Sequence, residues 1–213
     1  DAHSRMIDGW DVLLMDMMDN LPADKPLITE FPPLYHFDDT GDTVFHHIEK
    51  LDQVNTHIAK EWSTDGWMHH PQKLVPENSA FPRHTRFLSG AFVFTLGEWN
   101  KEVQQDPEHF YTGEEFALTL RSFTKGYELF DPNQIALWHR LHPAPNRKFK
   151  DDNTETATLQ RHQQGVNRLN LLIDGDPNGL LGEFALGDIK TLEDYKNFSG
   201  IDCVNRTISI GAQ

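Results

Sequence analysis

The chain has 213 residues and a formal net charge of −14, from 19 Lys and Arg against 33 Asp and Glu, which argues against binding to nucleic acid or anionic lipid. Hydrophobic residues make up 38%, enough for a sizeable core, and no apolar run approaches the roughly 20 residues of a membrane span. The one cysteine, Cys203, excludes an internal disulfide and is typical of a cytoplasmic protein.

The first third of the chain predicts one clear helix. Over residues 7–21 the apolar side chains recur at helical spacing, so one helix face is expected to be buried. Residues 27–31 are expected to form a short strand before two prolines. Residues 32–43 are predicted to be a polar loop, and residues 53–86 a long irregular segment of the kind that tends to carry binding residues.

The middle of the chain predicts a strand followed by two helices. Residues 87–96 are the best candidate for a strand, and Gly90 within it indicates a close approach of backbone or ligand. A short helix is expected over 97–105. Thr112 and Glu115 have the spacing of a capping box, so a second helix is expected to begin there and to end at Gly126.

The last third predicts two strands and then helices. Residues 127–130 and 135–139 are expected to be strands around an Asp-Pro-Asn turn. Apolar spacing predicts a long helix over 159–173, and Thr191 and Gly200 mark the expected ends of another.

Three short motifs could carry chemistry, the first of which is Asp1-Ala2-His3. A strand projects residues two apart to the same face, so this carboxylate and this imidazole could hold one cation together. The mixed oxygen and nitrogen ligands would suit Mn²⁺ or another divalent ion. On its own the motif is weak, and a surface acid beside an unrelated histidine is the commoner explanation.

The second motif is Leu-Trp-His-Arg-Leu-His over residues 137–142. His139 or His142 could be a metal ligand at the end of an apolar strand, and Arg140 could contact phosphate. A core histidine beside a surface one explains the same pattern.

The third motif is Gly113-Glu114-Glu115 at a helix start. Glu114 could bind sugar hydroxyls, although negative charge is favoured at any helix N-terminus. The other histidines, including His46–His47 and His69–His70, are expected to be surface or packing residues. The sequence contains neither a P-loop nor a G-x-G-x-x-G motif. The absence of these phosphate-binding loops argues against a kinase or a Rossmann dehydrogenase.

Several motifs follow one another in a familiar order. They are Asp-x-His at 1–3, Gly-Trp-Asp at 9–11, Leu-x-Thr-x-x-Pro-Pro at 27–33, Gly-Glu-Glu at 113–115, Leu-Arg at 120–121, Gly-Tyr at 126–127, the strand ending in His139, Leu-Gly-Asp-Ile-Lys-Thr-Leu at 186–192, and Gly-Ile-Asp at 200–202. Together they resemble the GlcNAc-transferase family typified by the cytoplasmic enzyme that modifies hydroxyproline on Skp1. The polypeptide GalNAc-transferases are more distantly similar.

The resemblance implies an α/β, GT-A-like fold with a mixed central sheet flanked by helices. Residues 1–150 would form the metal and acceptor half of the catalytic domain, and residues 151–213 a helical C-terminal extension packed on it. In this family the Asp-x-His motif is internal, so the N-terminal nucleotide-binding half is expected to be missing from this chain.

The resemblance also implies retaining transfer of a sugar, GlcNAc by analogy, from a UDP-sugar to a hydroxyl of a protein or glycan, with Mn²⁺ or Mg²⁺ as cofactor. Asp1, His3 and His139 would hold the metal, with His142 as the second choice for the third ligand. Catalytic roles would fall to Glu114 and Glu115. Substrate would contact Gly90, Gly113, Arg5, Arg140 and Trp67.

Two other functions stay open. The chain could be a non-catalytic, glycosyltransferase-like binding module that lost its donor half, as its start at Asp1 suggests. It could less readily be a metal-dependent hydrolase, since H-E-x-x-H and paired-acid metal motifs are absent from the sequence.

Overall fold

The computed structural model describes residues 3–75, 79–110, 113–140 and 154–209. Within them lie two four-stranded mixed sheets, ordered β1-β12-β3-β4 and β10-β2-β11-β9. The first consists of β1 (Ser4–Met6), β12 (Leu137–Arg140), β3 (Leu34–Phe37) and β4 (Thr43–Phe45). The second consists of β10 (Val93–Thr95), β2 (Pro26–Thr29), β11 (Glu128–Asp131) and β9 (Arg83–His84).

Prolines explain why there are two sheets where one central sheet was expected. The chain runs from β2 into β3 and, later, from β11 into β12. Strand β2 is parallel to β11 in one sheet, with Ile28 opposite Phe130, and β3 is parallel to β12 in the other, with Leu34 opposite His139. Pro32 and Pro33 interrupt one path and Pro132 the other. Because proline has no N–H to donate, neither ladder continues through this break.

Three two-stranded sheets complete the β structure. They are β5 (Asn55–His57) with β8 (Gln72–Leu74), β6 (Glu61–Trp62) with β7 (Met68–His69), and β13 (Ile201–Asp202) with β14 (Thr207–Ile208). The segment predicted to be irregular therefore contains short hairpin pairs.

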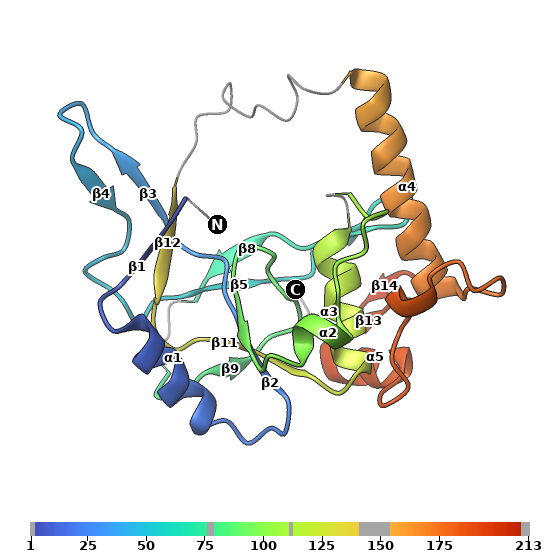
Figure 1. Ribbon diagram of the computed structural model, residues 1–213, viewed down its shortest axis with the longest axis horizontal. Coiled ribbons are helices and arrows are strands. Elements are labelled where there is room, and N and C mark those ends of the chain that lie inside the picture. The colour runs from blue at the N-terminus through green and yellow to red at the C-terminus, as the bar shows by residue number, and fades with distance from the viewer. Residues whose placement is uncertain (1–2, 76–78, 111–112, 141–153, 210–213) are drawn as a thin grey trace.

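The prediction of an amphipathic N-terminal helix is confirmed. Helix α1 (Trp10–Asp19) buries Leu14 and Met17 against Ile28 of β2 and Leu137 of β12. It thereby covers strands from both sheets (Figure 1).

Two predictions about strands were wrong. Residues 32–43 do not form a loop throughout, because β3 lies within them and buries Tyr35. The strand predicted over 87–96 is reduced to β10. Before it, the Thr29 hydroxyl accepts from the Ser89 N–H at 2.8 Å and donates to the Phe92 carbonyl at 2.9 Å, which holds this segment as a turn.

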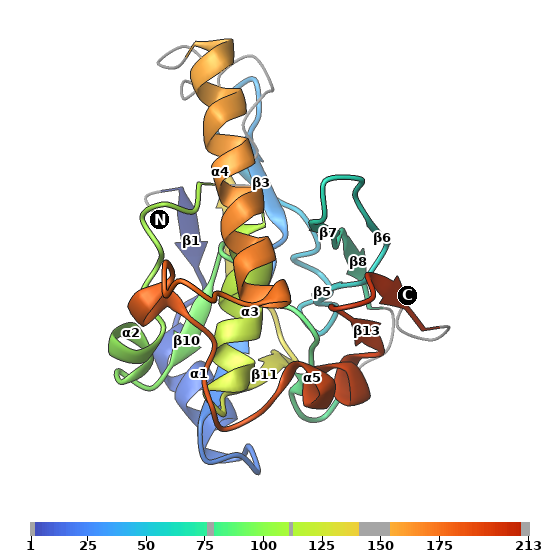
Figure 2. The same cartoon turned by 90° about the vertical axis from the view of Figure 1, so that its right-hand side faces the viewer.

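The remaining helices are α2 (Trp99–Glu102), α3 (Glu114–Thr124), α4 (Glu155–Asp174), the 3₁₀ helix η3 (Gly182–Phe184) and α5 (Leu192–Ser199). Phe116 and Leu120 of α3 share one core cluster with Leu169 of α4 and Tyr195 of α5. The N-terminal half of α4 projects away from α3 and α5, on the same side of the molecule as β3 (Figure 2). Among the described residues, no helix is both long and apolar enough to cross a membrane.

The predicted start of α5 at Thr191 is confirmed, whereas the capping box predicted at the start of α3 was wrong. In α5, the Thr191 hydroxyl accepts from the Asp194 N–H, and the Asp194 carboxylate accepts from the Thr191 N–H. Helix α3 instead begins at Gly113, which has φ +74° and makes no side-chain cap hydrogen bond. The N-cap is therefore glycine in a left-handed conformation, and Thr112 lies outside the described residues.

Candidate functional site

Five of the predicted site residues line one cavity of about 670 Å³, here called the central cavity. They are Trp67, Gly90, Gly113, Glu114 and Glu115. Its other lining residues are Phe31, His57, His69, His70, Pro71 and Gln72. Among the described residues the lining contains neither Lys nor Arg, so Glu114 and Glu115 give this part of the cavity a negative character. The irregular segment therefore does supply a wall of the site, facing the start of α3.

Glu115 ties two walls of the central cavity together. Its Oε1 atom accepts a hydrogen bond from the Gly90 N–H at 2.7 Å, in place of the capping role predicted for it. A Cβ atom at position 90 would lie 3.3 Å from that oxygen and 3.4 Å from Glu115 Cγ. The close approach predicted at Gly90 is thus made by the Glu115 side chain.

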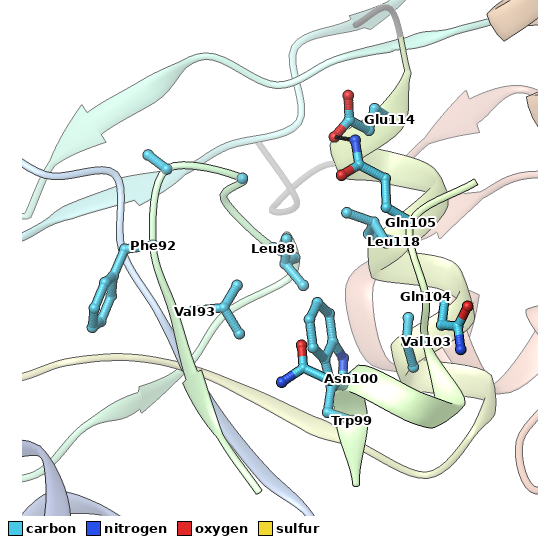
Figure 3. A pocket seen from close by; sticks show the side chains of 12 residues that line it. Leu88, Phe92, Val93, Trp99, Asn100, Val103, Gln104, Gln105, Glu114 and Leu118 are labelled. Carbon is cyan, nitrogen blue, oxygen red and sulfur yellow. Dashed lines mark hydrogen bonds between the residues drawn. The ribbon is translucent and has the colours of Figure 1, made fainter. Parts of the chain in front are cut away.

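Glu114 lies between the central cavity and a second one. The second cavity, of about 590 Å³, shares Gly90 and Glu114 with the first and is here called the Trp99 cavity (Figure 3). Oε1 of Glu114 accepts a hydrogen bond from Gln105 Nε2 at 2.6 Å. Neither Gln105 nor the second cavity was predicted, because no sequence motif marks a loop glutamine that folds back onto a helix start.

The central cavity also contains a pair of histidines expected only to pack or to face solvent. His70 stacks on Phe87, with ring centroids 4.6 Å apart and planes 15° apart. Its Nδ1 atom lies 3.2 Å from Nδ1 of His57, which is 6% exposed. Burial, and then the charge of His57, lower the pKa of His70 to about 3. His70 is therefore a neutral imidazole at physiological pH.

Two of the predicted metal ligands, His3 and His139, and the predicted arginines Arg5 and Arg140 lie on or next to β1 and β12. The rings of His3 and His139 are 6.0 Å apart at neighbouring strand ends, and the Arg140 N–H donates to the His3 carbonyl. Burial, and then the charge of His3, lower the pKa of His139. Asp1 and His142 lie outside the described residues, and among those described no group of three His, Cys, Asp or Glu side chains is placed to hold a metal.

The two predicted arginines contact aromatic rings of β3. Arg5 lies over Tyr35 at 5.6 Å and Arg140 over Phe37 at 4.9 Å, as measured from guanidinium carbon to ring centroid. The β1–β12 group adjoins the central cavity through the backbone, because the His139 N–H donates to the Pro33 carbonyl and Phe31 lines the cavity. The predicted site residues that the structure describes therefore form two groups, one in the central cavity and one at β1 and β12.

A buried acid pair lies at the break between the two sheets. Glu30 is 1% exposed and Asp131 5% exposed. Both oxygens of Glu30 lack a hydrogen-bond partner among the described residues. Burial, followed by the charge of Asp131, raises the pKa of Glu30, and burial raises the pKa of Asp131 from its ordinary value to about 7. This pair could not be predicted from the sequence, because Glu30 and Asp131 are far apart along the chain.

The chain has an α/β fold with mixed sheets. Its central cavity is lined by carboxylates, imidazoles and an indole, a set of side chains that suits a polar ring such as a sugar. The model of the family described as Glycosyltransferase (GlcNAc) matches residues 1–205. The chain belongs to this GlcNAc glycosyltransferase family, and glycosyl transfer, with a sugar donor and an acceptor, is its role. No curated protein matches the chain.

Proposed function

We propose that the protein is a metal-dependent, retaining glycosyltransferase of GT-A type that moves GlcNAc from UDP-GlcNAc to a hydroxyl on a protein or glycan. The observation that carries this proposal is the central cavity, where five residues predicted for catalysis or substrate binding meet. The likeness to the cytoplasmic Skp1-modifying type belongs to the same proposal. So does the division into a catalytic part, 1–150, and a helical extension, 151–213.

The cation site would be built on His3 and His139. Two imidazoles 6.0 Å apart at neighbouring strand ends fit a shared ion, and the lowered pKa of His139 keeps it in the neutral form that a metal ligand requires. Asp1, two residues before His3, would add a carboxylate. A bound Mn²⁺ or Mg²⁺ would supply Lewis-acid neutralisation of the charge that develops on the diphosphate.

Different side chains would bind the diphosphate and the sugar of the donor. Arg5 and Arg140, which share the β1–β12 pair with the histidines, would contact phosphate oxygens. Glu114 would accept hydrogen bonds from sugar hydroxyls, and Trp67 would stack on a sugar ring. Gly113 and the Glu115–Gly90 bond would fix the cavity wall. Retention of configuration requires no dedicated base, and we assign none.

Calorimetric titration of UDP with and without Mn²⁺ tests this proposal. We expect binding that requires Mn²⁺ and that is lost in His3→Ala and His139→Ala. His46→Ala, a change at an exposed histidine on β4's edge of the same sheet, is the control and should bind as the unmodified protein does.

Other results would point elsewhere. A folded protein that binds no UDP under either condition would contradict the proposal and favour a non-catalytic binding module. Metal binding at His3 with hydrolytic turnover of substrates other than nucleotide sugars would favour a hydrolase.

A further inference from the structure

His57 and His70 contact each other through their Nδ1 atoms, and this contact admits a single proton between them. Nδ1 of His57 lies 2.8 Å from the His70 carbonyl oxygen and 3.2 Å from His70 Nδ1. A carbonyl only accepts, so His57 must carry its proton on Nδ1. His57 Nε2 is buried and has no partner among the described residues. Burying a bare ring nitrogen costs less free energy than burying an N–H group without an acceptor, which agrees with the Nδ1–H tautomer of His57.

The tautomer of His57 decides that of His70. The single hydrogen on His57 Nδ1 faces both the carbonyl oxygen and Nδ1 of His70, so the hydrogen bond between the two rings requires His70 Nδ1 to be the bare, accepting nitrogen. His70 is neutral, so its only ring proton is on Nε2. One ring face of His70 lies on Phe87 and its Nδ1 edge faces His57, while the residue stays partly exposed and lines the central cavity. The edge that carries Nε2–H is left for the cavity.

We infer that His70 binds the sugar part of the substrate by donating its Nε2–H to a sugar oxygen, and that His57 is the positioning residue that fixes this tautomer. This inference rests on the proposed function. The ligand group would be uncharged, because the lining contains two carboxylates and, within the part of the chain that the structure describes, neither Lys nor Arg. An acetamido carbonyl or a hydroxyl oxygen of the sugar fits this requirement, and a phosphate does not.

The chain offers matched substitutions at both positions. The amide nitrogen of Gln can replace His Nε2, whereas that of Asn can replace His Nδ1. His70→Gln therefore keeps the donor toward the cavity, and His70→Phe keeps only the stacking on Phe87. His57→Asn keeps the donor toward His70, and His57→Leu removes it.

Kinetics with UDP-GlcNAc and Mn²⁺ test the contact to the ligand. We expect His70→Phe to raise the donor KM about tenfold, the usual effect of one lost hydrogen bond, and His70→Gln to restore most of the affinity. UDP affinity should stay the same in both variants, because the diphosphate is assigned to the β1–β12 group. An unchanged KM in His70→Phe would overturn the contact.

Imidazole ¹⁵N–¹H spectra of the full chain test the positioning role independently of turnover. We expect Nδ1–H on His57 and Nε2–H on His70, with a shift of the His70 Nε2–H signal when N-acetylglucosamine is added. His57→Leu should give a mixture of His70 tautomers, and His57→Asn should retain Nε2–H. Nδ1–H on His70, or an unaltered tautomer in His57→Leu, would overturn the inference. Absent UDP binding with these tautomers in place would instead contradict the proposed function.

Discussion

The backbone N–H of Gly90 donates to the Glu115 carboxylate at 2.7 Å, and this bond joins the turn before β10 to the first turn of α3. Both residues line the central cavity. A methyl group at position 90 would lie 3.3 Å from the accepting oxygen, so Gly90→Ala requires the Glu115 side chain to shift by a few tenths of an ångström. We expect this shift, which weakens the charge-assisted hydrogen bond, to lower kcat/KM for UDP-GlcNAc by up to about tenfold, the effect of losing the bond entirely.

Gly97→Ala is the matched control, because a Cβ atom there meets no atom within 4 Å. Its kcat/KM should equal that of the unmodified protein. Equal activities in the two variants would show that the Gly90–Glu115 bond does not shape the site.

The hydrogen bond from Gln105 to Glu114 predicts a pH-dependent variant. Gln105→Glu would place a second carboxylate about where an amide now donates at 2.6 Å. The repulsion between two carboxylates this close raises the pKa of one of them. Once that carboxyl is protonated, a hydrogen bond between positions 105 and 114 can form again. We expect activity about tenfold lower at neutral pH, with part of the loss recovered as pH falls, measured as kcat/KM against pH.

Gln163→Glu is the control, because it adds the same charge on the exposed side of α4, where Gln163 bonds only Asn167 among the described residues. Its pH profile should match that of the unmodified protein. A Gln105→Glu profile parallel to the unmodified one would contradict the role given to Gln105.

The sequence predicted local structure well and long-range contacts poorly. Helix α1 and the two ends of α5 were predicted because apolar spacing and helix-end residues are properties of neighbouring residues. The division into two sheets was not, because it depends on two proline breaks meeting in space.

The same distinction applies to the site. Glu114 and Gly113 were found because they form a motif at a helix start. Gln105, His57 and His70 were missed because each acts through a partner that only the fold brings near. A histidine doublet such as His69–His70 gives no indication of which ring nitrogen is held by a neighbour.

The two capped helices allow a comparison of cap strength in different surroundings. Thr191 caps α5, where Tyr195 is fully buried, whereas Thr154 caps the exposed beginning of α4. Loss of an N-cap costs about 1 kcal/mol where the helix end is held by the rest of the fold. We expect Thr191→Ala to lower the free energy of unfolding by about that amount and Thr154→Ala by clearly less, because that end of α4 packs little. Urea unfolding measures both, and equal losses would show that the packing of α5 does not transmit the effect of its cap.

The acid pair at the sheet break should make stability depend on pH. The pKa of Asp131 is about 7 in the folded chain, because of burial, and about 4 when unfolded, so folding takes up a proton between these values. The stabilising contribution is complete below about pH 4 and is lost as pH rises through 7. For one proton the free energy of unfolding should fall by about 1.4 kcal/mol per pH unit across this window. Glu30, whose pKa is also raised, adds to the change in the same direction.

Asp131→Asn removes one titrating group, so it should flatten this dependence and stabilise the protein most at pH 7 and above. Asp39→Asn, at an exposed position of the β3–β4 turn, serves as the control and should leave the slope intact. Urea unfolding monitored by circular dichroism between pH 4 and pH 8 measures all three proteins. A flat curve for the unmodified protein would mean that Asp131 stays ionised in the fold. Arg83, the cross-strand neighbour whose charge acts to lower the pKa of Asp131, would then be the group that keeps this carboxylate ionised.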